Sequence, residues 1–254
     1  MTEPVHFPAN PEKFEFDDQV ASIFPNMARR SIPYYEEMHR THADIVVQFV
    51  KDHYDKRHVE MLDIGASHGE FASLLLNRFE MMGQDYHVKL LDASPDMCEH
   101  MIDRYRNYDR VKVIQKPFGL DVMLDMAGKC DIVACHYVAQ FVPLKERGLF
   151  ITRIAQVMRP GALLLWGEKE SYIRPQSDHH RSIIKTMESL YNQFRLDNGY
   201  TQEEIDAKTK ALSGSMWPID SVQTQWMLEQ AGFHQVIPTF RYGQFHCFAT
   251  VKVG

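Results

Sequence analysis

Cysteine, basic charge and long apolar runs are all scarce in this chain of 254 residues. Its four cysteines include no Cys-x-x-Cys pair, so neither a zinc site nor a disulfide framework is indicated, and a reducing cytoplasm fits. Lysine and arginine number 28 against 34 aspartate and glutamate residues, which leaves no overall basic charge for nucleic acid. No apolar run approaches the ~20 residues that span a bilayer, and the N-terminus lacks a signal-peptide pattern. We therefore expect a cytoplasmic protein that binds neither nucleic acid nor membrane.

A metal site is not expected either. The adjacent pair His179-His180 is the most conspicuous grouping of the 13 histidines, but neighbouring residues point apart on a helix. No carboxylate or third histidine stands at a spacing that would complete a metal site around this pair.

The composition is otherwise that of a globular protein, with 44% hydrophobic and 24% charged residues, so a sizeable core is expected. We divide the chain into an extended lead-in over residues 1–13 and one domain over residues 14–254. Within that domain we expect a helical lid over residues 14–56, interrupted at Pro25, and a helical insertion over residues 169–217.

A strand, a tight turn and a helix are predicted around residue 67. Residues 59–64 are a mostly apolar run typical of a buried strand, and residues 70–77 have helical spacing. The turn between them is Gly65-Ala66-Ser67-His68-Gly69, whose glycines allow close approach of a ligand at a helix N-terminus. The dinucleotide fingerprint would need glycine at Ser67 and Glu70, which argues against NAD and FAD. An ordinary strand-to-helix turn of another α/β protein is the alternative.

An acidic residue follows the second predicted strand, residues 87–91. In Rossmann-like folds an acid at this strand end accepts hydrogen bonds from ribose hydroxyl groups, so Asp92 is our candidate ribose ligand. The alternative is an acid that only stabilises the turn. Ser94 and Pro95 then start a helix whose buried face we assign to Met97, Met101, Ile102 and Tyr105.

A histidine ends the fourth predicted strand, residues 130–136, which follows a third strand over residues 110–116. His136 therefore falls at the carboxyl edge where open α/β sheets place ligands. Its near-neutral reference pKa would suit a general base, whereas a purely structural histidine is the alternative.

The remaining segments complete a mostly parallel sheet of seven strands. A fifth strand follows Arg159-Pro-Gly, and the insertion is expected to hold helices over residues 183–196 and 202–212. An amphipathic helix over residues 221–231, with Val222, Trp226 and Leu228 buried, precedes two closing strands over residues 236–242 and 245–252. Gly243 joins these two strands in an antiparallel hairpin.

Two known families resemble this chain. The segment Asp63-Ile-Gly65-Ala-Ser-His-Gly69 resembles the first motif of class I S-adenosylmethionine-dependent methyltransferases, acidic-x-Gly-x-Gly-x-Gly, with Ser67 in place of the middle glycine. Residues 14–35 closely resemble the leader of the carboxy-S-adenosylmethionine synthase family of tRNA wobble-uridine modification. The pair Gln140-Phe141 and the segment Asn198-Gly-Tyr200 resemble the same family, and the similarity extends from about residue 14 to about residue 252.

The resemblance implies a Rossmann-like class I methyltransferase fold that binds S-adenosyl-L-methionine, or carboxy-S-adenosyl-L-methionine in the alternative. It implies a cofactor-contacting Tyr35 in the lid and places His136 where the family has asparagine. It also implies that a homodimer can form. We assign residues 65–69 to the amino-acid portion, Asp92 to the ribose and Phe118 to adenine, although Phe118 could instead be part of the core. The full set of other assigned cofactor-binding residues is Asp63, Gly65, Ala66, Ser67, Gly69, Asp92, Ala93, Pro117 and Phe118.

The resemblance breaks in the insertion. In the resembled family, an arginine binds the extra carboxylate of the modified cofactor. The corresponding residue here is Thr209 or Lys210, and neither can form the bidentate hydrogen bonds that arginine makes to a carboxylate. Our leading hypothesis is therefore methyl transfer to a small-molecule acceptor, with Tyr200, Thr209 and Lys210 near that acceptor and His136 as the candidate base. A carboxy-S-adenosylmethionine synthase that uses prephenate is the alternative, and a non-catalytic cofactor-binding protein is the third.

Overall fold

A seven-stranded sheet forms the centre of this computed structural model, which describes residues 16–55 and 57–254. The strands are β1 (Val59–Ile64), β2 (Tyr86–Asp92), β3 (Val111–Gln115), β4 (Cys130–His136), β5 (Met158–Lys169), β6 (Phe233–Tyr242) and β7 (Phe245–Lys252). They lie in the order β3-β2-β1-β4-β5-β7-β6, and β7 runs antiparallel to both of its neighbours. The predicted mostly parallel sheet of seven strands, with its closing hairpin, is confirmed.

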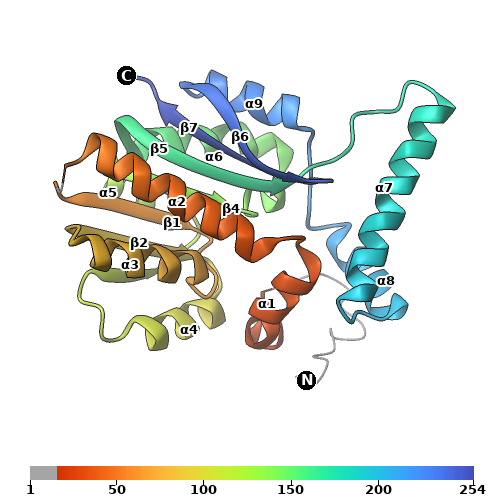
Figure 1. Cartoon of the computed structure of the whole chain (residues 1–254), viewed down its shortest axis with the longest axis horizontal. Coiled ribbons are helices and arrows are strands. Elements are labelled where there is room, and N and C mark those ends of the chain that lie inside the picture. Colours follow the sequence, from red (N-terminus) through yellow and green to blue (C-terminus); the bar gives the residue numbers. More distant parts are fainter. Residues whose placement is uncertain (1–15, 56) are drawn as a thin grey trace.

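Helices cover both faces of the sheet (Figure 1). They are α1 (Asp18–Ser31), α2 (Tyr35–His53), α3 (Glu70–Met82), α4 (Pro95–Tyr105), α5 (Leu120–Met126), α6 (Leu144–Val157), α7 (Asp178–Asp197), α8 (Gln202–Leu212) and α9 (Ser221–Gln230), with a short 3-10 helix at Ala139–Phe141. The lead-in predicted for residues 1–13, and the first two residues of the predicted lid, lie outside the described residues.

Two apolar cores lie on opposite faces of the sheet because successive strand residues point to opposite sides. Met61 of β1 packs into the core formed with α2, α3 and α4. Its neighbour Leu62 packs into the core formed with α5, α6 and α9. The strands are thereby held rigidly from both sides, and their carboxyl ends, including those of β1 and β4, are fixed in position.

Three helix-face predictions were wrong. Ile102 of α4 is 57% exposed, because it lies about 100° around the helix from the buried Met101. On α9, Val222 and Trp226 are 63% and 58% exposed, whereas Thr224 and Leu228 are buried. Both pairs are spaced four residues apart, so helical periodicity alone could not decide which face packs on the sheet.

The lid is more regular than predicted. Helix α1 continues through Pro25, although the sequence predicts an interruption there. A proline removes one intrahelical hydrogen bond, and burial of Val20 and Met27 on the same helix stabilises the helix despite this loss.

The fifth strand is longer than predicted. It begins at Met158, so Arg159 and Pro160 lie inside β5 instead of before it.

The predicted insertion contains α7 and α8. Helix α7 projects away from the sheet (Figure 1). Arg195 is the one buried residue on this helix. Helix α8 instead packs on the lid, where Ile205 and Ala211 share an apolar cluster with Val20 and Met27 of α1. The insertion therefore reaches the rest of the domain chiefly through the lid.

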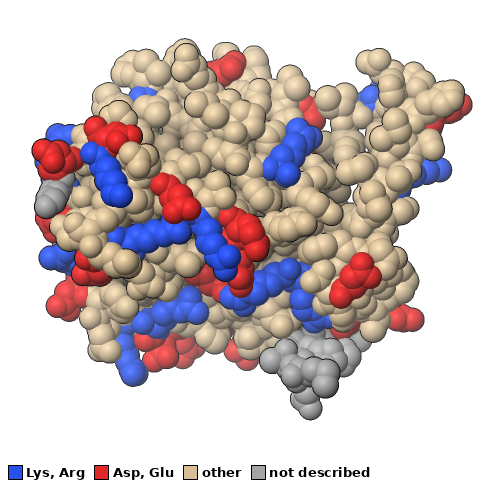
Figure 2. Space-filling view, viewed as in Figure 1, with Lys and Arg blue, Asp and Glu red and all other residues tan. Residues whose placement is uncertain are grey.

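Charges of both signs alternate over α2 and α3 on the face shown in Figure 2. Arg78 pairs with Asp44 at 2.9 Å and Arg40 with Glu36 at 3.3 Å, so basic residues on this face have acidic neighbours. None of the helices in the described part of the chain is both long and apolar enough to cross a bilayer.

Candidate functional site

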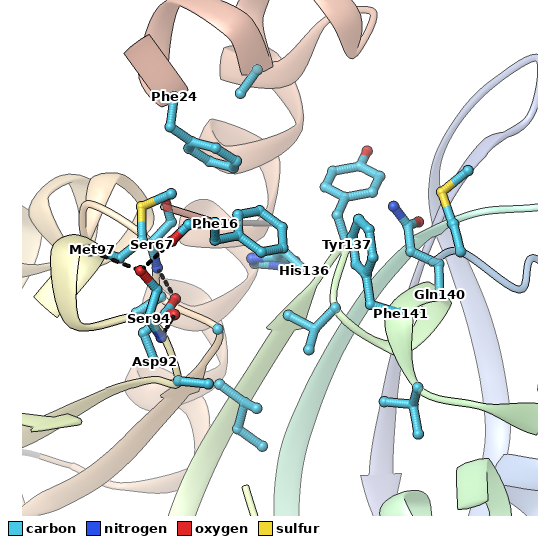
Figure 3. Close-up of a pocket in the computed structure, with 18 of the residues that line it drawn as sticks. Phe16, Phe24, Ser67, Asp92, Ser94, Met97, His136, Tyr137, Gln140 and Phe141 are labelled. Atoms are coloured by element: carbon cyan, nitrogen blue, oxygen red, sulfur yellow. Dashed lines mark hydrogen bonds between the residues drawn. The ribbon is translucent and has the colours of Figure 1, made fainter. Parts of the chain in front are cut away.

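A cavity of about 870 Å³ lies at the carboxyl ends of β1, β2 and β4. The lid helix α1, the start of α2, the 3-10 helix and α8 also contribute to its wall. Figure 3 shows Asp92 and Ser67 on one side of it, Gln140 and Phe141 on the other, and His136 between them. This volume is near the upper end of the roughly 300–1,000 Å³ that small-molecule sites occupy, so it can hold a cofactor together with a small second molecule.

The bend after β1 requires glycine. Gly65, Ser67 and Gly69 all adopt positive φ angles, of 67°, 54° and 69°. A Cβ on Gly65 would lie 2.3 Å from Cγ2 of Val138, and one on Gly69 would lie 2.6 Å from the Tyr105 ring. Close packing of Val138 and Tyr105 therefore requires glycine at these two positions, and Gly65, Ala66 and Ser67 line the cavity shortly before the N-terminus of α3.

Asp92 faces this bend. Its Oδ2 accepts a hydrogen bond from the Ser67 N–H (2.9 Å), and its Oδ1 accepts one from the Ser94 N–H (3.0 Å) (Figure 3). Burial raises the pKa of this carboxyl group, and the backbone donors oppose that rise. Each oxygen retains lone pairs on the cavity wall, so Asp92 can accept further hydrogen bonds from hydroxyl groups of a ligand.

Asp63 lies deeper, beneath the bend. It is buried, and burial together with the charge of Asp92 raises its pKa to about 8. Asp63 therefore holds its proton to a much higher pH than an exposed aspartate does. A cationic ammonium group beside the bend would favour its ionised form.

The bend, Asp92 and Asp63 together are called the cofactor end below. They fit S-adenosylmethionine, because the bend lines the cavity at a helix N-terminus, where the amino-acid portion could lie, and a fixed carboxylate beside it could accept from the ribose.

Aromatic residues of the lid cover the cavity. Phe16 packs edge-on against Phe141, with ring centroids 5.5 Å apart, and also contacts Phe24. The Ser94 hydroxyl donates to the Phe16 carbonyl oxygen at 2.7 Å, which fixes the start of the lid above β2 (Figure 3). Phe16, Phe24 and Phe141 thus form an aromatic part of the cavity wall.

The lid is fastened to the insertion. Arg30 Nε donates to the Asn198 carbonyl oxygen at 2.6 Å, and its guanidinium lies 4.5 Å from the centre of the Tyr200 ring. The Tyr200 hydroxyl lies 2.8 Å from Ser31 Oγ, which also accepts a hydrogen bond from Lys208 Nζ at 2.7 Å. Residues far apart in the sequence therefore form one cover over the cavity.

His136 belongs to a buried chain of hydrogen bonds. Its Nε2 lies 2.8 Å from Nδ1 of His42, whose Nε2 lies 2.7 Å from Oγ1 of Thr239. Burial lowers the pKa of His136 well below its usual value and that of His42 to about 4. The nearby His39 has its pKa lowered to about 3, by burial first and then by the charges of His42 and Arg29. All three imidazoles are therefore neutral at pH 7.

Lys169 stands at the end of β5, on the opposite side of the cavity from Asp92. The ends of β2 and β5 are separated by β1 and β4, which corresponds to three strand spacings of ~4.8 Å. The ammonium of Lys169 lies 4.7 Å from the ring centre of Tyr191 and 5.9 Å from that of Phe245. Burial, and then the charge of Arg195, lowers its pKa to about 8. Lys169, Tyr191 and Phe245 are called the cationic end below.

The structure brings most of the predicted cofactor residues together. Except for Gly69, which supports the bend through Tyr105, they all line the cavity. The residues concerned are Tyr35, Asp63, Gly65, Ala66, Ser67, Asp92, Ala93, Pro117, Phe118 and His136.

The predicted acceptor residues lie elsewhere. Thr209 and Lys210 are exposed, and Tyr200 is buried against the lid instead of lining the cavity. The α8 residue whose ammonium reaches the cavity wall is Lys208, adjacent to the predicted pair.

Sequence reasoning missed Lys169 and the pair His39 and His42. Lys169 could have been found by the strand-end rule that identified Asp92 and His136, had the fifth strand been extended to its observed end. No local sequence pattern distinguishes the two α2 histidines, because they lie on the buried face of an amphipathic helix like its other core residues.

Comparison with known proteins relates the chain to two groups. Residues 61–161 match the family described as "Methyltransferase domain". The chain is 30% identical to the carboxy-S-adenosyl-L-methionine synthase of Shewanella oneidensis, over 94% of this chain and 93% of the relative. The identity to the protein of the same name from Nautilia profundicola is also 30%, over 95% of both chains.

Solved structures confirm the fold. The CurJ carbon methyltransferase superposes with a TM-score of 0.65 at 14% identity, over 94% of this chain and 61% of that one. A Burkholderia thailandensis 1,6-didemethyltoxoflavin-N1-methyltransferase, solved with S-adenosylhomocysteine, gives 0.55 at 15% identity, over 92% and 88%. The predicted Rossmann-like class I methyltransferase fold is thereby confirmed.

Proposed function

This chain belongs to the carboxy-S-adenosyl-L-methionine synthase family and is an S-adenosylmethionine-dependent transferase; from that premise we propose that it methylates a small acceptor bearing an anionic group. The observation that supports this most directly is the single cavity with two chemically different ends. One end offers the glycine-containing bend and a carboxylate, and the other offers an ammonium group. The space between them is lined by aromatic residues and His136.

The cofactor end positions S-adenosylmethionine. When bound, this sulfonium compound supplies an activated methyl group, so the chain contributes chiefly orientation and exclusion of water. The bend around Ser67 would hold the amino-acid portion, and Asp92 would accept hydrogen bonds from the ribose. Pro117 and Phe118 would flank the adenine, with Phe118 supported edge-on by Phe150 at 5.6 Å.

The cationic end selects the acceptor. An ammonium group in a partly dehydrated, aromatic surrounding gains more from an anionic partner than it would in water. A carboxylate or comparable anion beside Lys169 would also raise the pKa of the lysine back toward its usual value. We therefore propose a small anion as the acceptor.

His136 would accept a proton from the acceptor where the reaction releases one. It is neutral at pH 7, and the chain through His42 to Thr239 fixes its ring orientation. His136→Asn is expected to lower kcat about 100-fold while S-adenosylmethionine binding persists. An unchanged kcat would contradict the role of a base, and a loss of binding as well would point to a structural role.

The carboxy-S-adenosylmethionine synthase reaction with prephenate is the second candidate. The names of the full-length relatives favour it, and Lys169 could receive a prephenate carboxylate. Against it, the residues at the position of the family's arginine, Thr209 and Lys210, are exposed outside the cavity. We therefore place methyl transfer first.

Mass spectrometry of the nucleoside that copurifies with the full chain tests both candidates. Methyl transfer predicts S-adenosylmethionine or its demethylated product, whereas the synthase reaction predicts a species heavier by one carboxyl group. Incubation with S-adenosylmethionine and a panel of small carboxylic acids, prephenate included, then tests turnover. The transferase proposal fails if calorimetry detects no S-adenosylmethionine binding.

A further inference from the structure

Three potential metal ligands meet at the amino ends of β1 and β2, at the opposite end of the strands from the cavity. His58, Glu60 and His87 each offer one ligand atom, and these atoms all lie within 4.8 Å of one another. They stand at the amino ends of β1 and β2, whereas the cavity lies at the carboxyl ends of these strands, and none of the three lines it. The proposed transferase reaction leaves this cluster without a role.

Strand geometry brings the three side chains together. His58 and Glu60 are two residues apart, so they point to the same side of the sheet. Glu60 is in register with His87 on the neighbouring parallel strand. As a result, Glu60 Oε1 lies 2.9 Å from His58 Nε2 and 3.1 Å from His87 Nδ1. Glu60 and His87 lie on rigid strands, and His58 directly precedes β1, so the sheet holds two of the three ligands in place.

Neighbouring residues orient two of the three ligands. Asp85 Oδ2 lies 2.9 Å from His58 Nδ1, which leaves Nε2 directed at Glu60. A carboxylate behind a metal-binding histidine is a recurrent arrangement, because it fixes the ring and increases its basicity. Lys89 Nζ donates to Glu60 Oε2 at 2.7 Å, so Oε1 is the oxygen that faces both imidazoles.

The cluster is open to solvent. The side chains of His58 and His87 are 35% and 56% exposed, so an ion can reach them from solvent.

We propose that His58 Nε2, Glu60 Oε1 and His87 Nδ1 bind one divalent transition-metal cation such as zinc, with the remaining position open to water. Two imidazoles and one carboxylate are a donor set that zinc and cobalt(II) accept in four-coordinate geometry. The ion would replace the two hydrogen bonds to Glu60 Oε1, while Lys89 and Asp85 keep their present contacts. It would thereby join β2 to β1 and to the residue directly before β1.

The experiment uses the full chain, stripped of metal and then equilibrated with zinc or cobalt(II). We expect one tightly held equivalent after desalting and, with cobalt, the visible absorption of a four-coordinate site. His87→Ala should lose both signals and should be folded by circular dichroism, because His87 is an exposed strand residue. His179→Ala is the matched control and should retain both, since it removes an exposed histidine far along the chain.

Two further variants separate a metal site from an ion-pair network. Glu60→Gln keeps the size of the side chain but removes its charge, so zinc affinity should fall at least tenfold. Lys89→Gln removes the ion pair without removing a ligand, so cobalt should still bind. No retained metal in the wild-type chain, or equal binding by His87→Ala and the wild type, would overturn the proposal. Because the site is remote from the cavity, S-adenosylmethionine affinity should be the same with and without zinc.

Discussion

The two ends of the cavity are built in different ways. The cofactor end consists of strand ends and one bend, and backbone N–H groups of Ser67 and Ser94 fix its key carboxylate. The cationic end consists of side chains that converge from β5, α7 and β7, which are far apart in the sequence. A backbone-built end tolerates few substitutions, whereas an end made of side chains can change its ligand by single replacements. We therefore expect the cofactor to be the fixed property of this fold and the acceptor the variable one.

Gly65→Ala would break the cofactor end most severely. The added Cβ meets Val138 at 2.3 Å and the residue keeps a positive φ, so unfolding should become easier by roughly 2–4 kcal/mol. S-adenosylmethionine binding should be lost. Gly83→Ala is the matched control, because its φ of 65° is nearly the same but no atom lies within 4 Å of the new Cβ; it should lose only about 1 kcal/mol. Urea unfolding and calorimetry measure both, and equal losses would contradict the crowding argument.

Asp92→Asn should weaken S-adenosylmethionine binding about 10- to 100-fold, since an uncharged amide replaces a carboxylate that is expected to accept from the ribose. Glu99→Gln on the exposed side of α4 is the control and should leave the affinity unchanged. Calorimetry with the wild type and both variants decides. An Asp92→Asn affinity within twofold of the wild type would exclude this carboxylate as the ribose ligand.

Lys169→Met should affect binding at the cationic end and leave binding at the cofactor end unchanged. The KM for the acceptor should rise about tenfold through loss of one charged contact, while S-adenosylmethionine binding stays the same. In the wild type, the KM for the acceptor should rise in the same way as the pH is raised above about 8. The reason is that a lysine with a pKa of about 8 gives up its proton, and with it its charge, above that pH. The measurement is KM from pH 6.5 to 9.5 for both proteins. A rise in the wild type that also appears in Lys169→Met would assign the titration to another group.

Arg29→Gln should have the smallest effect. Arg29 joins the lid to Glu70 of α3 at 2.6 Å, but its side chain is 46% exposed, so the pair contributes at most about 1 kcal/mol. We expect less than a fivefold change in S-adenosylmethionine affinity, and a smaller change still at high salt. Calorimetry at two salt concentrations tests this. A change of tenfold or more would mean that the lid, and not the bend, dominates cofactor binding.

The bend and the acid beside it could be located from the sequence because their signals are local, whereas their role in cofactor binding stays a prediction. The bend at Ser67 and the acid at Asp92 each follow directly from a strand and its neighbouring turn, so no knowledge of the remaining fold was needed. The helix faces of α4 and α9 were less predictable. Their hydrophobic patterns allow two orientations, and contacts with the sheet decide between them, as the exposure of Ile102 and Trp226 demonstrates.

The acceptor side was harder to predict because it depends on contacts over long sequence separations. Thr209 and Lys210 were assigned from resemblance, yet a shift of one position along α8 turns a helical residue through about 100°, and Lys208 faces the cavity instead. The proposed metal ligands show the same difficulty. Glu60 and His87 become neighbours through the pairing of two strands, which no short motif records.

Arg30 and Ser31 of the lid are hydrogen-bonded to the loop around Asn198 and Tyr200, and these bonds bear on the turnover rate. If product release needs the lid to open, the two bonded segments would have to move together, and the spent cofactor and the altered acceptor would leave through the same opening. We expect that this opening, a movement in the microsecond-to-millisecond range, can set the pace of turnover instead of the chemical step. Removal of these hydrogen bonds would then increase kcat and also admit water to the cavity.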